Sequence, residues 1–133
     1  MKRVLFVCIG NACRSPMAEG FANQYGSDVL SASSAGLAPL QRIPLETVAA
    51  MGEINVDVSR HVPRRYDPFE AADCDLVINM AGYKLPGPLG KKVVEWQVKD
   101  PFQASAEAYR AVRDDLERRV MRLILELRKQ SRK

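Results

Sequence analysis

Residues 7–19 read V-C-I-G-N-A-C-R-S-P-M-A-E, and they place Cys8 and Arg14 at the two ends of a short loop, with five residues between them. The apolar, β-branched run before Cys8 is typical of a buried strand, while Pro16 and Glu19 are typical of the first turn of a helix. The sequence therefore predicts a loop that joins the end of a strand to the start of a helix.

This loop has the composition of an anion-binding site. Gly10 and Asn11 tolerate positive φ, so successive backbone N–H groups can converge on one concavity. A helix that begins near Ser15 adds free N–H groups and the positive end of its dipole, and the guanidinium of Arg14 can bind two oxygens of a phosphate at once. We therefore expect the loop to bind phosphate.

The cysteine at the start of the loop is the candidate nucleophile. The positive field of the helix end and of Arg14 favours the thiolate form of Cys8, which is the nucleophilic form. The Ser15 hydroxyl can donate a hydrogen bond to the sulfur, and Asn11 is expected to brace the loop. This pattern predicts covalent catalysis in which Cys8 attacks phosphorus.

The rest of the chain alternates between strand and helix patterns. Strands are predicted near residues 2–8, 28–34, 75–80 and 92–96, helices near 15–25 and 44–51, and turn-rich linkers at 37–44, 61–68 and 82–90. A long final helix is predicted from an apolar stripe: Tyr109, Val112, Leu116, Val120, Leu123 and Leu127. We expect one α/β domain over residues 1–133, in three αβα layers, with a four-stranded parallel sheet in the flavodoxin-like order 2-1-3-4.

Composition favours a small cytoplasmic enzyme. The chain has 133 residues, 47% hydrophobic residues and a net charge of +4, and its sequence contains no signal-peptide or membrane-spanning pattern. We expect a monomer with no nucleic-acid or membrane partner. His61 is the only histidine, and Cys8, Cys13 and Cys74 lack zinc-type spacing, so neither a metal nor a cofactor is expected.

The motif C-I-G-N-A-C-R-S-P-M-A-E resembles the signature of the low-molecular-weight protein tyrosine phosphatase family. Later segments resemble that family in the same order, over nearly the whole chain: Ser34-Ala35-Gly36, Asp57–His61, Asp75–Met80 and Asp100-Pro101-Phe102. The resemblance implies that Cys8 accepts the phosphoryl group, with Arg14 binding it. Asp100 then protonates the leaving oxygen and later activates water. Asp67, also followed by proline, is the weaker candidate for the acid.

The predicted substrate is the phosphotyrosine of a phosphorylated protein or peptide. Leu40 and Phe102 offer apolar faces for a flat ring, in places where many eukaryotic members of the family carry aromatic residues. The predicted catalytic residues are Cys8, Arg14 and Asp100, and the predicted substrate-binding residues are Ile9, Gly10, Asn11, Ala12, Cys13, Ser15, Leu40 and Phe102.

Two relatives of the family supply alternative activities. The segment from Asp100 onward resembles bacterial protein arginine phosphatases, although Ala12 stands where those enzymes carry threonine. Thioredoxin-coupled arsenate reductases share the spacing from Ser34 to Pro44. They need additional cysteines near the end of the third strand, where this chain has residues 80–83, M-A-G-Y. Arsenate reduction therefore ranks below phosphatase activity at this point.

A non-catalytic phosphate-binding module is the remaining alternative. The presence of Cys8, Arg14 and Asp100 together argues against it, because binding alone needs neither a nucleophile nor an acid. Cys13 lies in the same loop as Cys8, and two roles stay open for it: a protective disulfide with Cys8 under oxidation, or simple packing beneath the loop.

Overall fold

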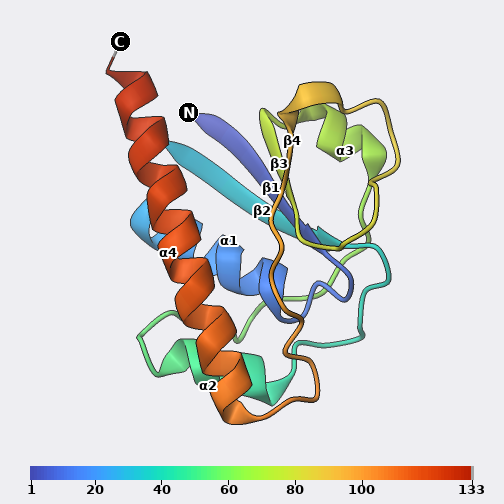
Figure 1. Ribbon diagram of the computed structural model, residues 1–133, viewed down its shortest axis with the longest axis vertical. Coiled ribbons are helices and arrows are strands. Elements are labelled where there is room, and N and C mark those ends of the chain that lie inside the picture. Colours follow the sequence, from blue (N-terminus) through green and yellow to red (C-terminus); the bar gives the residue numbers. More distant parts are fainter. Residues whose placement is uncertain (133) are drawn as a thin grey trace.

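The computed structural model describes residues 1–132 of the protein (Figure 1). Its elements in chain order are β1 (Lys2–Cys8), α1 (Arg14–Tyr25), β2 (Leu30–Gly36), α2 (Leu45–Gly52), α3 (Pro68–Asp73), β3 (Leu76–Asn79), the short 3-10 helix η1 (Gly90–Lys92), β4 (Val93–Glu95) and α4 (Ala106–Ser131). The predicted α/β alternation is confirmed.

The four strands form one parallel sheet in the order β2-β1-β3-β4, which confirms the predicted topology. Residues 4–8 of the central strand β1 are all buried, as expected for a continuous apolar run covered on both faces. In the register of the sheet, Cys8 lies opposite Gly36 and Val7 lies opposite Asn79. The carboxyl ends of these three strands therefore meet at the edge where the Cys8 loop begins.

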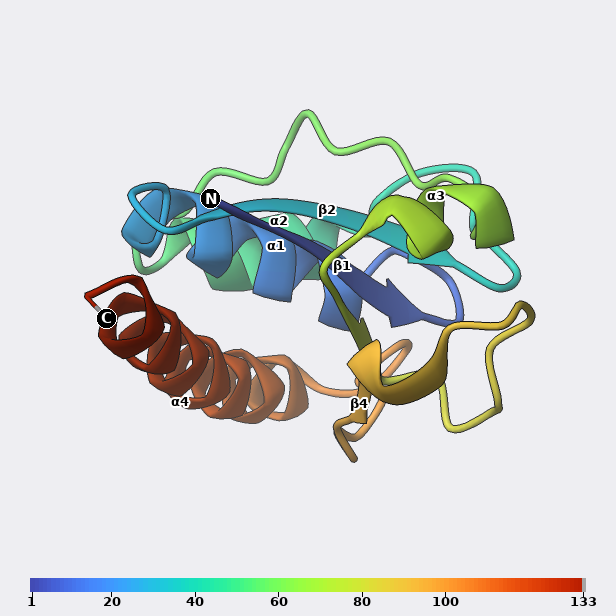
Figure 2. The ribbon, with the colours of Figure 1, turned by 90° about the horizontal axis from the view of Figure 1, so that it is seen from above.

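The two faces of the sheet are covered unequally, as Figure 2 shows, with α1, α2 and α4 on one side and α3 on the other. The larger core joins Phe6 of β1 to apolar residues of these helices, including Phe21 and Leu116. The smaller core on the other face gathers around Leu5 and Val77 and includes the thiol of Cys74. The layers are therefore αβα as predicted, with one thin layer formed by α3 and neighbouring loops.

Helix α3 is an element that the sequence pattern did not predict. It follows the expected 61–68 linker, which it overlaps only at Pro68, and six residues are too few to display a helical period. Asp67 caps it by accepting a hydrogen bond from the backbone N–H of Phe69 at 2.9 Å, with Pro68 in the first turn. Asp67 is thus a helix cap, which agrees with its place as the weaker of the two candidates for the catalytic acid.

Other element boundaries shift by one or two residues. Strand β2 begins at Leu30 rather than 28, because Val29 still closes a turn by donating its N–H to the Gly26 carbonyl. The apolar stripe of α4 differs from the prediction at one position. The side chain of Ile124 is fully buried, whereas Leu123, which was predicted for the buried stripe, is only half-buried. Ser105 caps this helix by accepting from the N–H of Ala108.

Within residues 1–132, none of the helices combines the length and the apolar composition needed to cross a lipid bilayer. The expected monomeric state stays a prediction.

Candidate active site

The loop from Cys8 to Cys13 connects β1 to α1 at the carboxyl edge of the sheet. Asn11 adopts the predicted positive φ, at 50°, whereas Gly10 does not. The small size of Gly10 serves a different purpose, since a Cβ there would lie 3.2 Å from Cγ of Leu40. Gly36 is more restrictive, because its Cβ would lie 2.6 Å from the Ile9 carbonyl oxygen and 2.8 Å from the Asn11 nitrogen. The end of β2 therefore packs directly against the loop.

Cys8 and Ser15 face each other across the base of the loop. The distance from Cys8 Sγ to Ser15 Oγ is 2.9 Å, and both residues are almost fully buried. The Ser15 hydroxyl therefore lies where the sequence predicted it, as a donor to a Cys8 thiolate.

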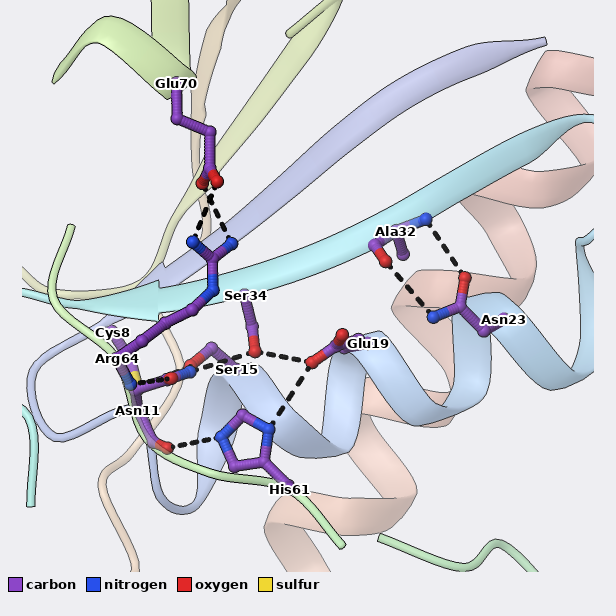
Figure 3. Close-up of polar contacts among 10 residues, drawn as sticks. All are labelled: Cys8, Asn11, Ser15, Glu19, Asn23, Ala32, Ser34, His61, Arg64 and Glu70. Carbon is purple, nitrogen blue, oxygen red and sulfur yellow. Dashed lines mark hydrogen bonds and ion pairs between the residues drawn. The ribbon is translucent and has the colours of Figure 1, made fainter. Parts of the chain in front are cut away.

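Asn11 braces the loop from its centre, as Figure 3 shows. Its Nδ2 donates to Ser15 Oγ at 2.8 Å and to Ser34 Oγ at 2.9 Å, while its Oδ1 accepts from the backbone N–H of Arg64 at 2.9 Å. Because Asn11 is completely buried, each of these bonds replaces one that water would otherwise make. The predicted bracing role therefore fits the geometry, and two of the three partners, Ser34 and Arg64, lie far away in sequence.

A second tier of polar residues supports Asn11, and no sequence pattern predicted it (Figure 3). Ser34 Oγ donates to Glu19 Oε1 at 2.5 Å, and His61 Nδ1 lies 3.7 Å from the same oxygen. His61 Nε2 is 2.8 Å from the Asn11 carbonyl oxygen, which can only accept, so Nε2 carries a proton. Glu19 lies beyond the first turn of α1, not within it as the sequence predicted, and its carboxylate belongs to this network instead.

Arg14 lies inside the protein with its guanidinium fixed by two backbone carbonyls. Its Nη1 donates to the carbonyl oxygens of Met80, at 2.6 Å, and Val98, at 3.1 Å, and its side chain is 7% exposed. Its Nε is buried and has no hydrogen-bond partner among the described residues. A buried donor without a partner is rare in folded proteins, and an oxygen of a bound anion would satisfy it.

Asp100 reaches the same guanidinium from the segment between β4 and α4. Its Oδ2 lies 3.6 Å from Arg14 Nη2, and its side chain is 48% exposed. Its other oxygen accepts from the N–H of Phe102 at 3.1 Å, which fixes the turn. The structure thus brings Asp100 to Arg14, with the partly exposed Phe102 beside it in the chain.

The remaining predicted residues hold the loop in place. The carbonyl of Ile9 accepts from the N–H of Ala38, and that of Gly10 accepts from the N–H of Leu40. Thr47 Oγ1 donates to the Ala12 carbonyl at 2.9 Å. The loop is thereby tied to the β2–α2 connection and to α2.

Cys13 packs into the larger core beneath the loop. Its Sγ lies 3.5 Å from Thr47 Oγ1 and donates to the Tyr109 hydroxyl at 3.7 Å. Burial raises the pKa of the Cys13 thiol above its usual value. These contacts favour the packing role of Cys13 over a role as a reactive thiol.

The geometry defines a site for a tetrahedral oxyanion. The first N–H groups of α1 have no acceptor within the helix, the Arg14 Nε is unpartnered, and Cys8 lies at the base of the same loop. The described residues contain no group of three or more His, Cys, Asp or Glu side chains that would hold a metal ion. The chemistry that this site supports is nucleophilic attack by a thiolate on the centre of a bound oxyanion, with Asp100 available for proton transfer.

Known proteins resemble this chain in sequence over nearly its whole length. Residues 3–86 match the family model described as low molecular weight phosphotyrosine protein phosphatase. The "Glutaredoxin arsenate reductase" of Synechocystis sp. is 37% identical over 96% of this chain and 99% of its own length. An arsenate reductase of Halalkalibacterium halodurans is 33% identical over 90% of this chain and 92% of its own.

A solved structure, "An arsenate reductase in the phosphate binding state", superposes with a TM-score of 0.84 at 35% identity, covering 96% of this chain and 99% of that one. The similarity to these arsenate reductases thus extends over nearly their whole length. The predicted phosphotyrosine substrate was therefore wrong, and arsenate reduction, which ranked lower on sequence motifs alone, has the better support.

Proposed function

We propose that this enzyme, which belongs to the low molecular weight phosphotyrosine protein phosphatase family, reduces arsenate to arsenite. The observation that carries the proposal is its similarity to arsenate reductases over 96% of the chain. The site agrees with it, because arsenate and phosphate are both tetrahedral oxyanions that such a loop accepts.

Arsenate would bind with its oxygens on the backbone N–H groups of the loop and on the free Nε–H of Arg14. In the first step the Cys8 thiolate attacks arsenic, so that an S–As bond forms and one As–O bond breaks. Asp100 protonates the departing oxygen, which leaves as water. Ser15 holds the attacking sulfur by the hydrogen bond already in place at 2.9 Å.

The second step needs two electrons, and we propose that external thiols supply them. One thiolate attacks Cys8 Sγ, forming an S–S bond while the S–As electron pair stays with arsenic, which departs as arsenite. A second thiol then attacks the mixed disulfide and releases Cys8. One arsenate and two thiols thus give one arsenite, one disulfide and one water.

The positions of the other cysteines support an external reductant. Cys13 is engaged with Thr47 and Tyr109 beneath the loop, and Cys74 lies in the smaller core on the opposite face of the sheet. The segment 80–83, where the resemblance to thioredoxin-coupled enzymes calls for cysteines, contains none. The Synechocystis relative is named a glutaredoxin arsenate reductase, and that name fits a thiol system of the glutathione class.

The experiment measures arsenite formed by the purified protein with arsenate, glutathione and glutaredoxin. The matched pair of variants is Cys8→Ser and Cys74→Ser. We expect turnover in the wild type and in Cys74→Ser, and none in Cys8→Ser. Wild-type protein that forms no arsenite with glutathione, glutaredoxin or dithiothreitol would overturn the proposal.

A further inference from the structure

A cleft of about 620 Å³ lies beside the anion loop, between the segment after β3 and the segment after β4. Its volume is in the range of sites that bind small molecules. The anion loop is here the stretch of residues 8–15, and of these residues Arg14 lines the cleft. Its guanidinium donates to the carbonyls of Met80 and Val98, which lie in the same wall. The cleft and the anion loop therefore share the Arg14 side chain.

The walls of this cleft are held in place by one buried amide. Asn79, 1% exposed, donates from Nδ2 to the Tyr83 carbonyl at 2.7 Å and to Glu95 Oε1 at 3.2 Å. Its Oδ1 accepts from the N–H of Ala81 at 2.9 Å. A single side chain thus joins the β3 side of the cleft to the β4 side. The cleft is a preformed feature rather than a gap between loose loops.

The lining of the cleft favours a small anion with some apolar surface. Lys84 and Lys99 bring positive charge from the two segments, and Tyr83 and Trp96 provide ring surface. The carboxylate of Glu95 also lines the cleft and is already bonded to Asn79. Two ammonium groups and one carboxylate match a ligand that carries two carboxylates and one amine.

We propose that this cleft binds the external reductant as a small peptide thiol with two carboxylates, for which glutathione is the probe. This inference rests on the proposed arsenate reduction, because it assigns a place to the thiol of the second step. The ligand carboxylates would pair with Lys84 and Lys99, and its thiol would lie on the Arg14 side. From there its thiolate attacks Cys8 Sγ, an S–S bond forms, the S–As bond breaks, and arsenic keeps the electron pair.

Binding is tested apart from catalysis with S-methylglutathione, which has the same charges and no free thiol. Trp96 is the only tryptophan of the chain and lines the cleft, so its fluorescence reports binding directly. We expect saturable quenching or a spectral shift in the wild type. Loss of two exposed charge contacts should weaken binding roughly fivefold to twentyfold in the double variant Lys84→Ala/Lys99→Ala.

The matched control is Lys91→Ala, which removes an exposed lysine of η1 outside the cleft lining. It should bind S-methylglutathione as the wild type does. No response of Trp96, or equal affinity in the double variant, would overturn the cleft as the binding site.

The role of the ligand is tested by the ratio of the arsenite rates supported by glutathione and by uncharged dithiothreitol. This ratio should fall in the double variant and stay unchanged in Lys91→Ala. An equal ratio in all three proteins would overturn the inference while leaving arsenate reduction intact. Absence of arsenite with either thiol would instead overturn the proposed function, and with it the reductant role, whatever the fluorescence shows.

Discussion

The loop from Cys8 to Ser15 and the segment from Met80 to Gln103 meet at Arg14, but they are built in opposite ways. In the loop, Asn11 and Ser15 are fully buried and their polar side-chain atoms are bonded within the protein. The segment is mostly exposed and turns through positive φ at Gly82, Gly87, Gly90 and Gln103. In the proposed mechanism the loop fixes the geometry of a reaction on an oxyanion, whereas the segment provides the proposed acid, Asp100, and one side of the cleft.

This contrast predicts a division of roles within the site. Backbone N–H groups and a guanidinium recognise the oxygens of a tetrahedral anion and have little means of sensing its central atom. In the proposed mechanism the fate of the covalent adduct depends on whether water or a thiol reaches it, and we place the entry of the thiol at the cleft beside the exposed segment. Four substitutions test this division: two lie in the loop, one lies in the exposed segment, and one lies far from both.

The largest effect is expected at the nucleophile. Cys8→Ser replaces a thiolate with a hydroxyl that stays protonated, so arsenite formation should fall by roughly 10³-fold or more. The tight loop should survive the change, and inorganic phosphate should still bind when titrated by calorimetry. A variant that keeps more than about a tenth of wild-type turnover would show that the S–As intermediate is not on the pathway.

In the exposed segment the largest effect is expected at Asp100. Asp100→Asn keeps the hydrogen bond to Phe102 within reach but removes the proton donor, and the first step should slow by roughly 10²-fold or more. Rapid-quench measurement of adduct formation isolates that step from reduction by the thiol. Asp67→Asn is the matched control, because Asp67 caps α3 away from Arg14. Equal slowing of both variants would remove Asp100 from its proposed role.

Within the loop, Asn11→Ala should lower both the stability of the fold and the rate of arsenite formation. The substitution leaves the N–H of Arg64 without its partner and removes two further hydrogen bonds of a buried side chain. The free energy of unfolding should therefore fall by about 2–4 kcal/mol. Asn23→Ala is the control, because Asn23 also bonds the backbone of β2, at Ala32, but is exposed. Urea denaturation compares the two, and equal losses would contradict the claim that the loop depends on its buried braces.

The smallest effect is expected far from both regions, where Glu53 joins the end of α2 to α4. Its carboxylate lies 2.8 Å from Arg110 and 2.6 Å from Arg113, and these guanidinium groups lower the pKa of Glu53 from 4.5 to about 2. A lowered carboxylate pKa adds stability that is fully present above pH 4.5 and is lost as pH falls towards 2.

Glu53→Gln should therefore lower Tm modestly at about pH 6. The Tm difference between this variant and the wild type should shrink as pH falls and be nearly gone by about pH 2. Glu126→Gln, at an exposed position of α4, should track the wild type throughout. A Tm difference for Glu53→Gln that grows on acidification would have the wrong sign for this ion pair.

The loop and the fold were predictable because their signals are local. The apolar run of β1, a residue tolerant of positive φ at Asn11 and the helix start after Cys13 all lie within one short stretch. The pairing of strands followed from the α/β alternation. Helix α3 was missed because six residues carry no readable period, and its only signal was Asp67 before proline.

The support behind the loop was not predictable in the same way. Ser34, Glu19 and His61 are separated by 15 to 50 positions from the groups they bond, and nothing in their own neighbourhoods indicates those contacts. The substrate was misassigned for a related reason. Leu40 and Phe102 were taken as walls for an aromatic ring, but Leu40 packs against Gly10, and the choice between substrates rests on the whole chain's similarity to arsenate reductases.

The most direct test of external-thiol reduction at this loop is the chemical state of Cys8 after the first thiol has reacted and before a second one can. The wild-type enzyme is mixed with arsenate and one equivalent of glutathione, without glutaredoxin, then quenched in acid with an alkylating agent and digested for mass spectrometry, while arsenite is measured in the same sample. We expect arsenite together with a glutathione mixed disulfide on Cys8, and alkylated thiols at Cys13 and Cys74. A disulfide between Cys8 and Cys13, or an unmodified Cys8 with no arsenite, would contradict it.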